Sequence, residues 1–508
     1  MKIKFLLRIT LLMAITTTSC NSEKAQTSAE FKNEKICNYT EMQKHIAENA
    51  IKLPSENNPI ATLRFSADPT VLVYNDTLYV YGTNDSQQLE YTKGKESNGY
   101  NKINTLNCLS TKDLVNWTDE GIIYVAGKEN PNGPAKWATN SWAPAICCKK
   151  IDGKDKFFLY FADSANGIGV LTADSPTGPF IDPIGKALIS RSETPNTEGV
   201  HWLFDPAVIV DDDGKGYLYY GGGIQEDPVH PKSARCVALN DDMISLACDP
   251  IQLDPPYLFE DSGINKIGNK YYYSYCSNFI DRQGATGFGV SPVGTICYMT
   301  SDKPLGPYTY AGYTLHNPAI YFGPGGNNHH WIFQFKNKWY IAYHTQTLEQ
   351  GCKLEKGGYR NLFIDEFLIN EDGSFPIQKG TKEGVAQICN FDPCQKVPAA
   401  TFNYNVKVLI TDDLTVTPIA NNAYFALKGV DFSKKPSTIT FTSVNEKSNG
   451  SVKVVLDQWS GSKVISEVTI NGKGDFTGSI NFPEGEDSVR NVYFVMNGSL
   501  ELASWQCK

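Results

Sequence analysis

The segment Asn75-Asp76-Thr77-Leu78-Tyr79-Val80-Tyr81 is a polar turn followed by alternating aromatic and aliphatic residues. Alternation with a period of two is the pattern of a β-strand with one buried face. The same turn and aromatic strand return at 155–160, 214–219, 268–273 and 336–341. Five divergent copies predict five short antiparallel sheets around one axis, the blades of a β-propeller. A sandwich of two sheets with coincidental turns is the alternative.

Composition and charge narrow the class of protein. The 508 residues exceed what one hydrophobic core usually covers, so two domains are expected. Gly, Asn, Asp and Pro separate short runs of Tyr, Val and Ile, which favours an all-β protein. The formal net charge of -9 without a basic cluster argues against nucleic acid or an anionic polymer as partner. A neutral substrate fits this composition better.

A second domain is expected at the C-terminus. The aromatic repeat stops near residues 391–397, and from Ala399 the chain is rich in Val, Ile and Thr with polar turns such as Asn471-Gly472. Regularly spaced strands over this length predict a β-sandwich of the jelly-roll kind. We therefore divide the chain into a propeller at 59–390 and a sandwich at 398–508.

The N-terminus reads as an export signal. Met1-Lys2-Ile3-Lys4 is positively charged, and residues 5–15 form an apolar core too short to span a bilayer. The signal ends in Thr17-Thr18-Ser19-Cys20, which resembles a bacterial lipobox, so we expect lipidation of Cys20 after cleavage in front of it. An ordinary secretory signal is the alternative. Residues 21–58 are then a tether and lead-in, and the protein is expected at the outer membrane or cell surface, held to the membrane by its lipid alone.

Twelve cysteines remain once Cys20 is set aside, and an exported protein can oxidise them. Cys389 and Cys394 are the pair to test first, although an even count does not establish connectivity. Metal binding by the adjacent Cys147 and Cys148 is disfavoured, because no CxxC motif or histidine cluster accompanies them.

Three carboxylates interrupt apolar strands just before the aromatic repeats. Asp68-Pro69 precedes the first repeat and Asp205-Pro206 the third, in matching contexts, while Glu260-Asp261 precedes the fourth. Each alone is an ordinary turn opening. Because the innermost strands of a propeller run along its channel, their shared position predicts that the three carboxylates meet near the axis. Glu260 and Asp261 are neighbours in an extended strand, so only one of them should point into the pocket.

With these carboxylates, four further motifs make residues 64–378 resemble glycoside hydrolase family 43, whose members are five-bladed propellers. The motifs are Leu109–Trp117, Ser141-Trp142-Ala143-Pro144, Asp211-Asp212-Asp213-Gly214 and Gly326-Asn327-Asn328-His329-His330. The resemblance implies that Asp68 is the general base, Glu260 the general acid and Asp205 the residue that raises the pKa of the acid. An inverting glycosidase needs this division, with a base that activates water on one side of the sugar and an acid on the other.

The resemblance also implies residues that bind substrate and metal. His329 matches a histidine on the propeller axis that often holds calcium with its water shell; a structural histidine is the alternative. Arg360 matches an arginine that binds substrate hydroxyls, against a salt-bridged structural role. Trp142 and Phe204 are expected to form apolar walls for the sugar, although aromatic residues in a core are far commoner than in a site.

The C-terminal domain resembles carbohydrate-binding module family 6 at 422–432, 454–457 and 502–505. Tyr424 and Phe476 could each stack on a sugar there, and a purely structural sandwich is the alternative. For the whole chain the resemblances imply release of α-L-arabinofuranose from arabinoxylan or arabinan. A β-D-xylosidase acting on xylo-oligosaccharides is the nearest alternative. A non-catalytic surface glycan-binding protein is the other, and it should have lost one of the three carboxylates. Oligomeric state and bond linkage are left open.

Overall fold

The computed structural model describes residues 31–508 except 224–226, 288 and 484. In this part the chain is mostly β-strand, with helices α1 (Glu41–Asn49), α2 (Asp85–Thr92), α3 (Ala319–Phe322) and α4 (Thr347–Cys352). The predicted signal peptide with Cys20, and residues 21–30 of the predicted tether, lie outside the described residues. None of the described helices is both long and apolar enough to cross a bilayer.

Five antiparallel sheets, called the N-terminal sheets below, follow one another along the described part of residues 67–366. The first contains β1 (Ala67–Tyr74), β2 (Thr77–Thr83), β3 (Thr105–Thr111), β4 (Trp117–Tyr124) and the later β21 (Thr401–Phe402). The second contains β5 (Trp142–Ile151), β6 (Lys154–Ala162), β7 (Gly167–Ala173) and β8 (Ile189–Ser190). The third contains β9 (Ala207–Val210), β10 (Gly216–Gly221), β11 (Ala234–Ala238) and β12 (Ile251–Leu253). The fourth contains β13 (Leu258–Ile267), β14 (Lys270–Ser277), β15 (Ile296–Ser301) and β16 (Thr309–Leu315). The fifth contains β17 (His330–Phe335), β18 (Lys338–Thr345) and β19 (Asn361–Glu366).

The five aromatic strands expected from the sequence are the second strands of these sheets, β2, β6, β10, β14 and β18. Each pairs with the first strand of its sheet across the expected turn. The first strands contact one another in the order β1, β5, β9, β13, β17, and β17 also contacts β1. The starts of the five sheets are thereby brought toward one region of the molecule.

The alternating tyrosines of these strands form the core between the sheets. Tyr160, Tyr219 and Tyr273 are fully buried, and the rings of Tyr219 and Tyr273 stack with centroids 5.8 Å apart. Burying one large apolar side chain stabilises the fold by roughly 1.5–3 kcal/mol. The repeated aromatic residues therefore contribute to the packing between neighbouring sheets.

Two further sheets, the C-terminal sheets, cover the rest of the chain. One contains β20 (Val397–Pro398), β23 (Val408–Ile410), β24 (Val416–Pro418), β26 (Thr438–Ser443), β29 (Gly474–Ser479) and β31 (Leu502–Cys507). The other contains β22 (Tyr404–Val406), β25 (Ala423–Asp431), β27 (Asn449–Leu456), β28 (Val464–Asn471) and β30 (Val489–Ser499). Their buried side chains, including Phe425, Phe494 and Trp505, form a hydrophobic core of their own.

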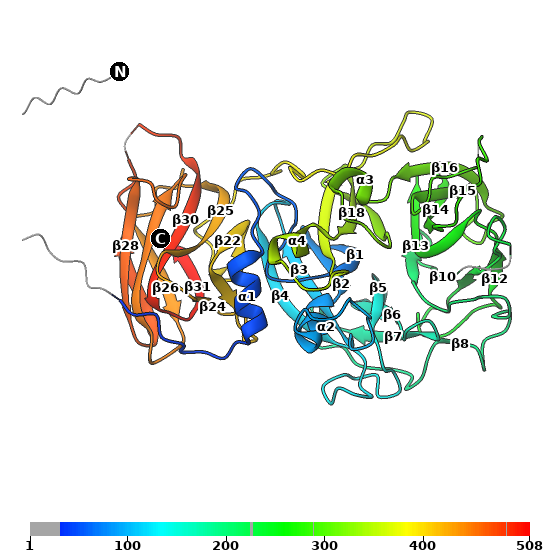
Figure 1. Ribbon diagram of the computed structural model, residues 1–508, viewed down its shortest axis with the longest axis horizontal. Coiled ribbons are helices and arrows are strands. Elements are labelled where there is room, and N and C mark those ends of the chain that lie inside the picture. The colour runs from blue at the N-terminus through cyan, green and yellow to red at the C-terminus, as the bar shows by residue number, and fades with distance from the viewer. Residues whose placement is uncertain (1–30, 224–226, 288, 484) are drawn as a thin grey trace, which may run out of the picture.

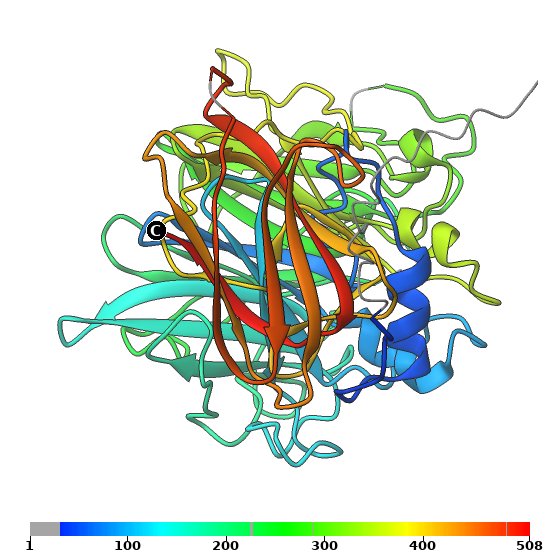
Figure 2. The same ribbon diagram turned by 90° about the vertical axis from the view of Figure 1, so that its left-hand side faces the viewer.

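The two sets of sheets lie side by side (Figure 1), and Figure 2 views the molecule from the side of the C-terminal sheets. They are joined through main-chain pairing, because Thr401 and Phe402 of β21 extend the first N-terminal sheet along β4. The side-chain amide of Asn116 also donates to the carbonyl of Lys428 at 2.9 Å. The C-terminal sheets are thus fixed to the first sheet.

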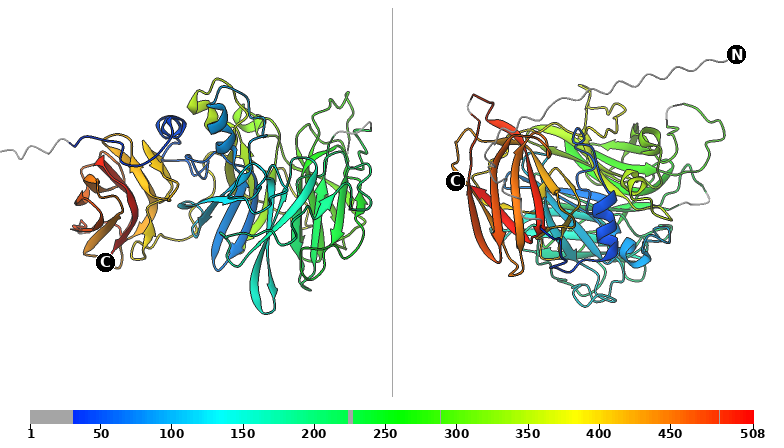
Figure 3. Two further views of the ribbon diagram at one scale, coloured as in Figure 1. Left: turned by 90° about the horizontal axis from the view of Figure 1, so that it is seen from below. Right: turned by 60° about the vertical axis from the view of Figure 1, so that its left-hand side comes forward.

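The lead-in to the first sheet contains a helix that the sequence analysis did not predict. Thr40 caps α1 by accepting from the Gln43 backbone, and Gln43 returns a side-chain bond to the Thr40 backbone. Met42 and Ile46 of this helix are buried in one cluster with residues of α2 and α4. Figure 3 shows α1 beside the junction of the two sets of sheets. Upstream of α1, Asn33 and Glu34 bond to Gly498 and Ser499 at the end of β30.

All twelve cysteines among the described residues are free thiols. Cys389 and Cys394, the pair to test first, therefore remain separate in this structure. Cys147 is buried within β5, and burial raises the pKa of its thiol above the ordinary value. The described residues contain no group of three or more His, Cys, Asp or Glu side chains placed to hold a metal ion.

Candidate active site

The first strands of four sheets begin with the same backbone feature. One residue at or near each start has a positive φ: Asp68 (49°), Ala143 (41°), Asp205 (50°), which lies two residues before β9, and Asp261 (69°), the fourth residue of β13. In β1, β5 and β13 the pairing with the second strand also shifts register beside this residue. Left-handed backbone in non-glycine residues is costly and gathers at functional sites. Here it turns the starts of the strands so that neighbouring side chains face a common space.

Hydrogen bonds connect these strand starts to one another. The Thr83 hydroxyl donates to Oδ2 of Asp68 at 2.7 Å and accepts from the Ala143 backbone at 2.9 Å. On the other side, the Asp261 backbone donates to Oδ2 of Asp205 at 2.8 Å. The carboxylates are therefore held by the scaffold itself and not by mobile surface loops.

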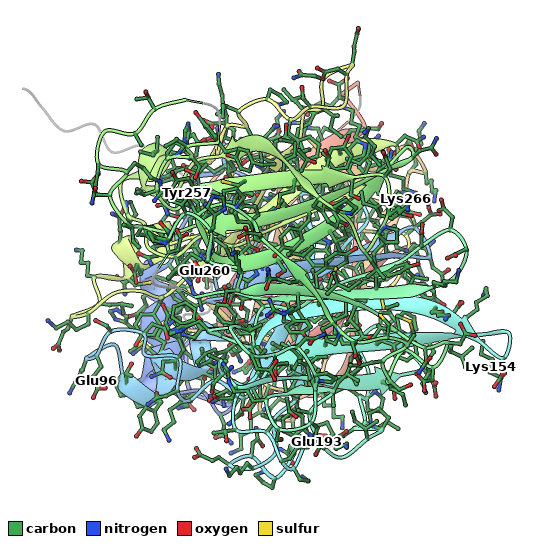
Figure 4. The ribbon with its side chains drawn as sticks, turned by 90° about the vertical axis from the view of Figure 1, so that its right-hand side faces the viewer. Glu96, Lys154, Glu193, Tyr257, Glu260 and Lys266 are labelled. Carbon is green, nitrogen blue, oxygen red and sulfur yellow. The ribbon has the colours of Figure 1, made fainter. Side chains whose placement is uncertain are left out.

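A cavity of about 430 Å³ lies at these strand starts. It is lined by Asp68, Tyr100, Trp142, Ala165, Trp202, Phe204, Asp205, Phe259, Glu260, Asn327, His329 and Arg360. All seven residues that the sequence analysis placed in the pocket of the first domain are among them. Figure 4 shows Glu260 inside the outline of the molecule, whereas Lys154, Glu193 and Glu96 lie toward its edge.

Asp68 is held as an ionised carboxylate. It is buried, and Nη1 of Arg360 donates to its Oδ1 at 2.8 Å. Burial alone raises the pKa of Asp68, but the adjacent Arg360 guanidinium outweighs burial and holds this pKa well below the usual range. The Asp68 backbone also donates to Nδ1 of His344 at 3.2 Å, while Nε2 of His344 bonds to the Asn327 carbonyl at 3.0 Å. Because a carbonyl only accepts, the proton of His344 belongs on Nε2.

Glu260 has the opposite electrostatic environment. Its Oε1 accepts from the Asn328 backbone at 3.1 Å, and the side chain is otherwise buried against the cavity. Burial, followed by the charge of Asp205, raises the pKa of Glu260 well above its ordinary value. Burial and the charge of Asp68 raise the pKa of Asp205 in the same direction. Asp205 and Glu260 thus form a coupled pair that favours retaining a proton.

Asp261 does not line the cavity, which agrees with the expectation that only one of Glu260 and Asp261 points into the pocket. It is completely buried, and its carboxylate contacts His330 through Oδ2 and Nδ1 at 2.5 Å. The other ring nitrogen of His330 contacts the Ser274 hydroxyl at 2.8 Å. The neighbouring residues Glu260 and Asp261 therefore separate, one toward the pocket and one into the scaffold.

Arg360 lies in the cavity wall and is also salt-bridged, so the two interpretations of this residue are not exclusive. Its Nε and Nη2 donate to the two carboxylate oxygens of Asp85, each at 2.9 Å. Its guanidinium carbon lies 4.8 Å from the centroid of the Tyr100 ring. Tyr100 in turn accepts through its carbonyl from the Trp142 indole at 3.1 Å.

His329 lies between carboxylates. Its Nδ1 is 3.4 Å from Oδ1 of Asp68, and its Nε2 is 3.1 Å from Oδ1 of Asp261. Flanking it in sequence, the side-chain oxygens of Asn327 and Asn328 are buried without a hydrogen-bond partner among the described residues. Carbonyl-type oxygens and water are what calcium prefers. The surroundings of His329 therefore suit a calcium ion held mainly through water, and not one enclosed by protein ligands.

Sequence reasoning missed several residues of this site: Asp85, Tyr100, Trp202, Phe259 and His344. Trp202 packs edge-on against both Phe204 and Phe259, with centroids 5.2 Å apart in each case. Trp202 lies two residues before Phe204, and Phe259 directly precedes Glu260, so their positions beside the carboxylates were an available signal. Tyr100 comes from a loop without periodicity, and no pattern pointed to it.

The two aromatic residues singled out in the C-terminal sheets do not share a surface. Tyr424 lies in β25 and Phe476 in β29, in different sheets. Tyr424 is 9% exposed, and the ring of Trp459 stacks on it at 5.6 Å and 11°. Trp459 itself is 43% exposed. The accessible aromatic face at this position is therefore that of Trp459.

The sequence model of "Glycosyl hydrolases family 43" matches residues 56–375, more than half of the chain. The chain belongs to glycoside hydrolase family 43. This family 43 protein is a glycosidase, and every carboxylate considered above lies inside the matched region.

Relatives extend the similarity beyond the family region. The chain is 42% identical to the arabinoxylan arabinofuranohydrolase of Paenibacillus polymyxa, over 90% of this chain and 75% of the relative. It is 29% identical to a xylosidase/arabinosidase of Bacteroides ovatus, over 63% of this chain and 96% of that protein. The crystal structure of a Bacillus subtilis arabinoxylan arabinofuranohydrolase in complex with cellotetraose superposes with a TM-score of 0.84 and 39% identity, covering 91% of this chain and 99% of that one. The last match includes the C-terminal sheets as well as the N-terminal ones.

Proposed function

We propose that this chain is an inverting α-L-arabinofuranosidase that removes arabinofuranosyl residues from arabinoxylan or arabinan. The observation that carries the proposal is the opposite tuning of two carboxyls in one cavity. Asp68 is held ionised by Arg360, whereas Glu260 is biased toward its protonated form by burial and by Asp205. Carboxyls whose pKa values are driven apart in one site are the usual arrangement for acid and base catalysis.

The roles follow from this tuning. Glu260 donates its proton to the glycosidic oxygen as the bond to the sugar breaks, so the leaving chain departs as a neutral alcohol. Asp68 accepts a proton from a water molecule that attacks the anomeric carbon from the opposite side. In inverting enzymes the two carboxyls stand about 6.5–9.5 Å apart to leave room for this water. Asp205 keeps Glu260 protonated until the leaving oxygen takes the proton.

Arabinofuranose is favoured as the released sugar by the names of the more similar relatives. The protein at 42% identity is an arabinoxylan arabinofuranohydrolase, and the relative named for both xylosidase and arabinosidase activity stands at 29%. β-D-Xylosidase action on xylo-oligosaccharides is the alternative. A non-catalytic glycan-binding role is disfavoured, because all three carboxylates are present and line one cavity.

The architecture that supports this site is proposed to be a five-bladed β-propeller at 59–390 followed by a jelly-roll sandwich at 398–508. The cyclic order of contacts among the first strands of the N-terminal sheets supports the propeller. The separate hydrophobic core of the C-terminal sheets supports the second domain.

We also propose that a calcium ion with its water shell sits at His329. His329 and the side-chain oxygens of Asn327 and Asn328 would hold it. When bound, the ion would supply positive charge beside the cluster of carboxylates. Calcium removal with EGTA should then lower activity, and calcium should restore it better than magnesium, because magnesium exchanges its own water shell reluctantly.

The C-terminal sheets are proposed to bind the polysaccharide. Tyr424 and Phe476 remain the residues expected from the sequence, and the exposed Trp459 stacked on Tyr424 supports a sugar-stacking surface on the side of Tyr424. This surface would hold the enzyme on its substrate without taking part in hydrolysis.

Export and lipid anchoring through Cys20 are proposed from the N-terminal sequence alone. If Cys20 is acylated, membranes from expressing cells should contain the protein, and Cys20→Ala should move it to the soluble fraction. The same distribution of wild type and Cys20→Ala between the membrane and soluble fractions would contradict the lipid anchor.

The function is tested by the products formed from arabinoxylan, arabinan and xylo-oligosaccharides. Arabinose as the dominant product from arabinoxylan or arabinan supports the proposal, and xylose from xylo-oligosaccharides supports the xylosidase alternative. Binding to these glycans without release of any sugar would show a binding scaffold and overturn the mechanism.

A further inference from the structure

Asp85 is a buried carboxylate that has no place in the mechanism given above. It is the first residue of α2, two positions after the end of β2, and its side chain is 0% exposed. Its Oδ1 accepts from Nη2 of Arg360 at 2.9 Å, and its Oδ2 accepts from Nε at 2.9 Å. Oδ2 also accepts from the Arg360 backbone at 2.9 Å. A carboxylate that grips one side of a guanidinium at two points fixes both its plane and its direction.

The free side of this guanidinium points at the proposed base. Nη1 of Arg360 donates to Oδ1 of Asp68 at 2.8 Å, so a single cation lies between two buried carboxylates. The Tyr100 ring, 4.8 Å away, limits the movement of Arg360 out of this plane. The position of Arg360 relative to Asp68 is therefore determined largely by Asp85.

The hydrogen bond from Arg360 affects how a water molecule can reach Asp68. Arg360 occupies one acceptor position on Oδ1, as Thr83 does on Oδ2, which restricts the directions from which a water molecule can approach the carboxylate.

We infer that Asp85 is a positioning residue that acts through Arg360 to set the orientation of the Asp68 carboxylate. The inference rests on the proposed role of Asp68 as base. If the inference holds, loss of Asp85 slows the chemical step when Arg360 is present. The same loss has no effect on the chemical step when Arg360 has already been replaced.

The test is a double-mutant cycle of Asp85→Asn and Arg360→Met, with kcat and KM measured separately on arabinoxylan oligosaccharides. Asp85→Asn alone is expected to lower kcat on the order of 10²-fold, the effect of a small misplacement of catalytic groups. In the Arg360→Met background the same substitution should leave kcat unchanged. A purely structural role would instead lower the amount of folded protein and leave the kcat of the folded fraction intact.

Asp119→Asn is the matched control. Asp119 is a buried partner of Arg64, with Oδ2 2.7 Å from Nε, and neither residue lines the catalytic cavity. The Asp119→Asn variant should keep the wild-type kcat while its folded state loses stability. If Asp85→Asn does not fold, as judged by circular dichroism, Asp85→Ser takes its place in the cycle.

The outcomes separate this inference from the proposed function. Wild-type kcat in Asp85→Asn, or equal losses from Asp85→Asn in both backgrounds, would overturn the positioning role while the wild type still releases arabinose. Failure of the wild type to release any sugar would instead overturn the proposed function, and with it the role of Asp68 on which the inference depends.

Discussion

Nη1 of Arg360 lies 2.8 Å from Oδ1 of Asp68, and both side chains are buried. This ion pair holds the pKa of Asp68 well below its ordinary value despite burial, which acts in the opposite direction. The ion pair therefore favours the ionised form of Asp68, which is the form that can act as a base.

Removal of Arg360 should lower kcat/KM most strongly at low pH. In Arg360→Met, burial of Asp68 is no longer offset by the guanidinium, so the pKa of Asp68 rises and the base becomes protonated at higher pH. The acidic limb of the profile of kcat/KM against pH should move upward, with a fall in the maximum on the order of 10²-fold. Arg64→Met is the control, because its buried ion pair with Asp119 lies outside the cavity. An acidic limb that stays in place would contradict this account.

Neutralisation of Asp205 should move the basic limb of the profile of kcat/KM against pH. The charge of Asp205 helps burial to raise the pKa of Glu260. In Asp205→Asn this contribution is lost, so the pKa of Glu260 falls and the acid loses its proton at lower pH. The basic limb of kcat/KM should shift toward acid, opposite in direction to the shift in Arg360→Met. A basic limb that moves upward or not at all would show that Asp205 does not act on Glu260.

The starts of the strands are where sequence reasoning was most informative. Asp68-Pro69 and Asp205-Pro206 could be recognised because the two segments have matching patterns and each precedes an aromatic strand. Strand alternation indicated that only one of Glu260 and Asp261 faces the pocket, and the resemblance to the family motif selected Glu260. The structure brings Asp68, Asp205 and Glu260 to one cavity at these positions.

The supporting residues could not be found in the same way, for physical reasons. Asp85 acts on Arg360 across 275 positions of the chain, and no local pattern encodes a contact of that separation. Tyr100 reaches the cavity from a loop, where neither helical nor strand periodicity applies. Helix α1 was missed because it is short and polar over most of its surface, and it is stabilised by its capping box and by packing of Met42 and Ile46.

Asp365 should make stability depend on pH. Burial is the largest influence on this carboxyl and raises its pKa to about 6, against the hydrogen bonds from Thr381 and Tyr343 that lower it. The pKa in the folded state lies above that in the unfolded state, so the stabilising contribution is complete below about pH 4 and is lost as pH rises through about 6. The corresponding change is at most about 3 kcal/mol.

The comparison of wild type with Asp365→Asn measures this effect. The stability advantage of the wild type over the variant, from thermal unfolding, should shrink between pH 4 and pH 7.5. Asp241→Asn, at a side chain that is 99% exposed, should show no such trend. A constant difference between wild type and Asp365→Asn across this range would contradict the raised pKa.

Trp459 should matter for binding to insoluble polysaccharide and not for hydrolysis of small substrates. Trp459→Ala removes the exposed ring that stacks on Tyr424, and adsorption to insoluble arabinoxylan should weaken roughly 10-fold. Its kcat/KM on a short soluble arabinoside should equal that of the wild type. Phe476→Ala, on the other sheet, tests whether a second surface contributes. Unchanged adsorption in both variants would favour a purely structural role for the C-terminal sheets.

The division of roles between Asp68 and Glu260 is tested most directly by the dependence of each variant on the leaving group. Glu260→Gln and Asp68→Asn are assayed on arabinoxylan, whose leaving alcohol needs a proton, and on an aryl arabinofuranoside, whose phenolate leaves without one. The kcat/KM of Glu260→Gln should fall about 10²–10⁴-fold on arabinoxylan but far less on the aryl substrate. The kcat/KM of Asp68→Asn should fall by similar factors on both substrates. Equal losses of Glu260→Gln on the two substrates, or a leaving-group dependence in Asp68→Asn, would contradict the assignment of Glu260 as acid and Asp68 as base.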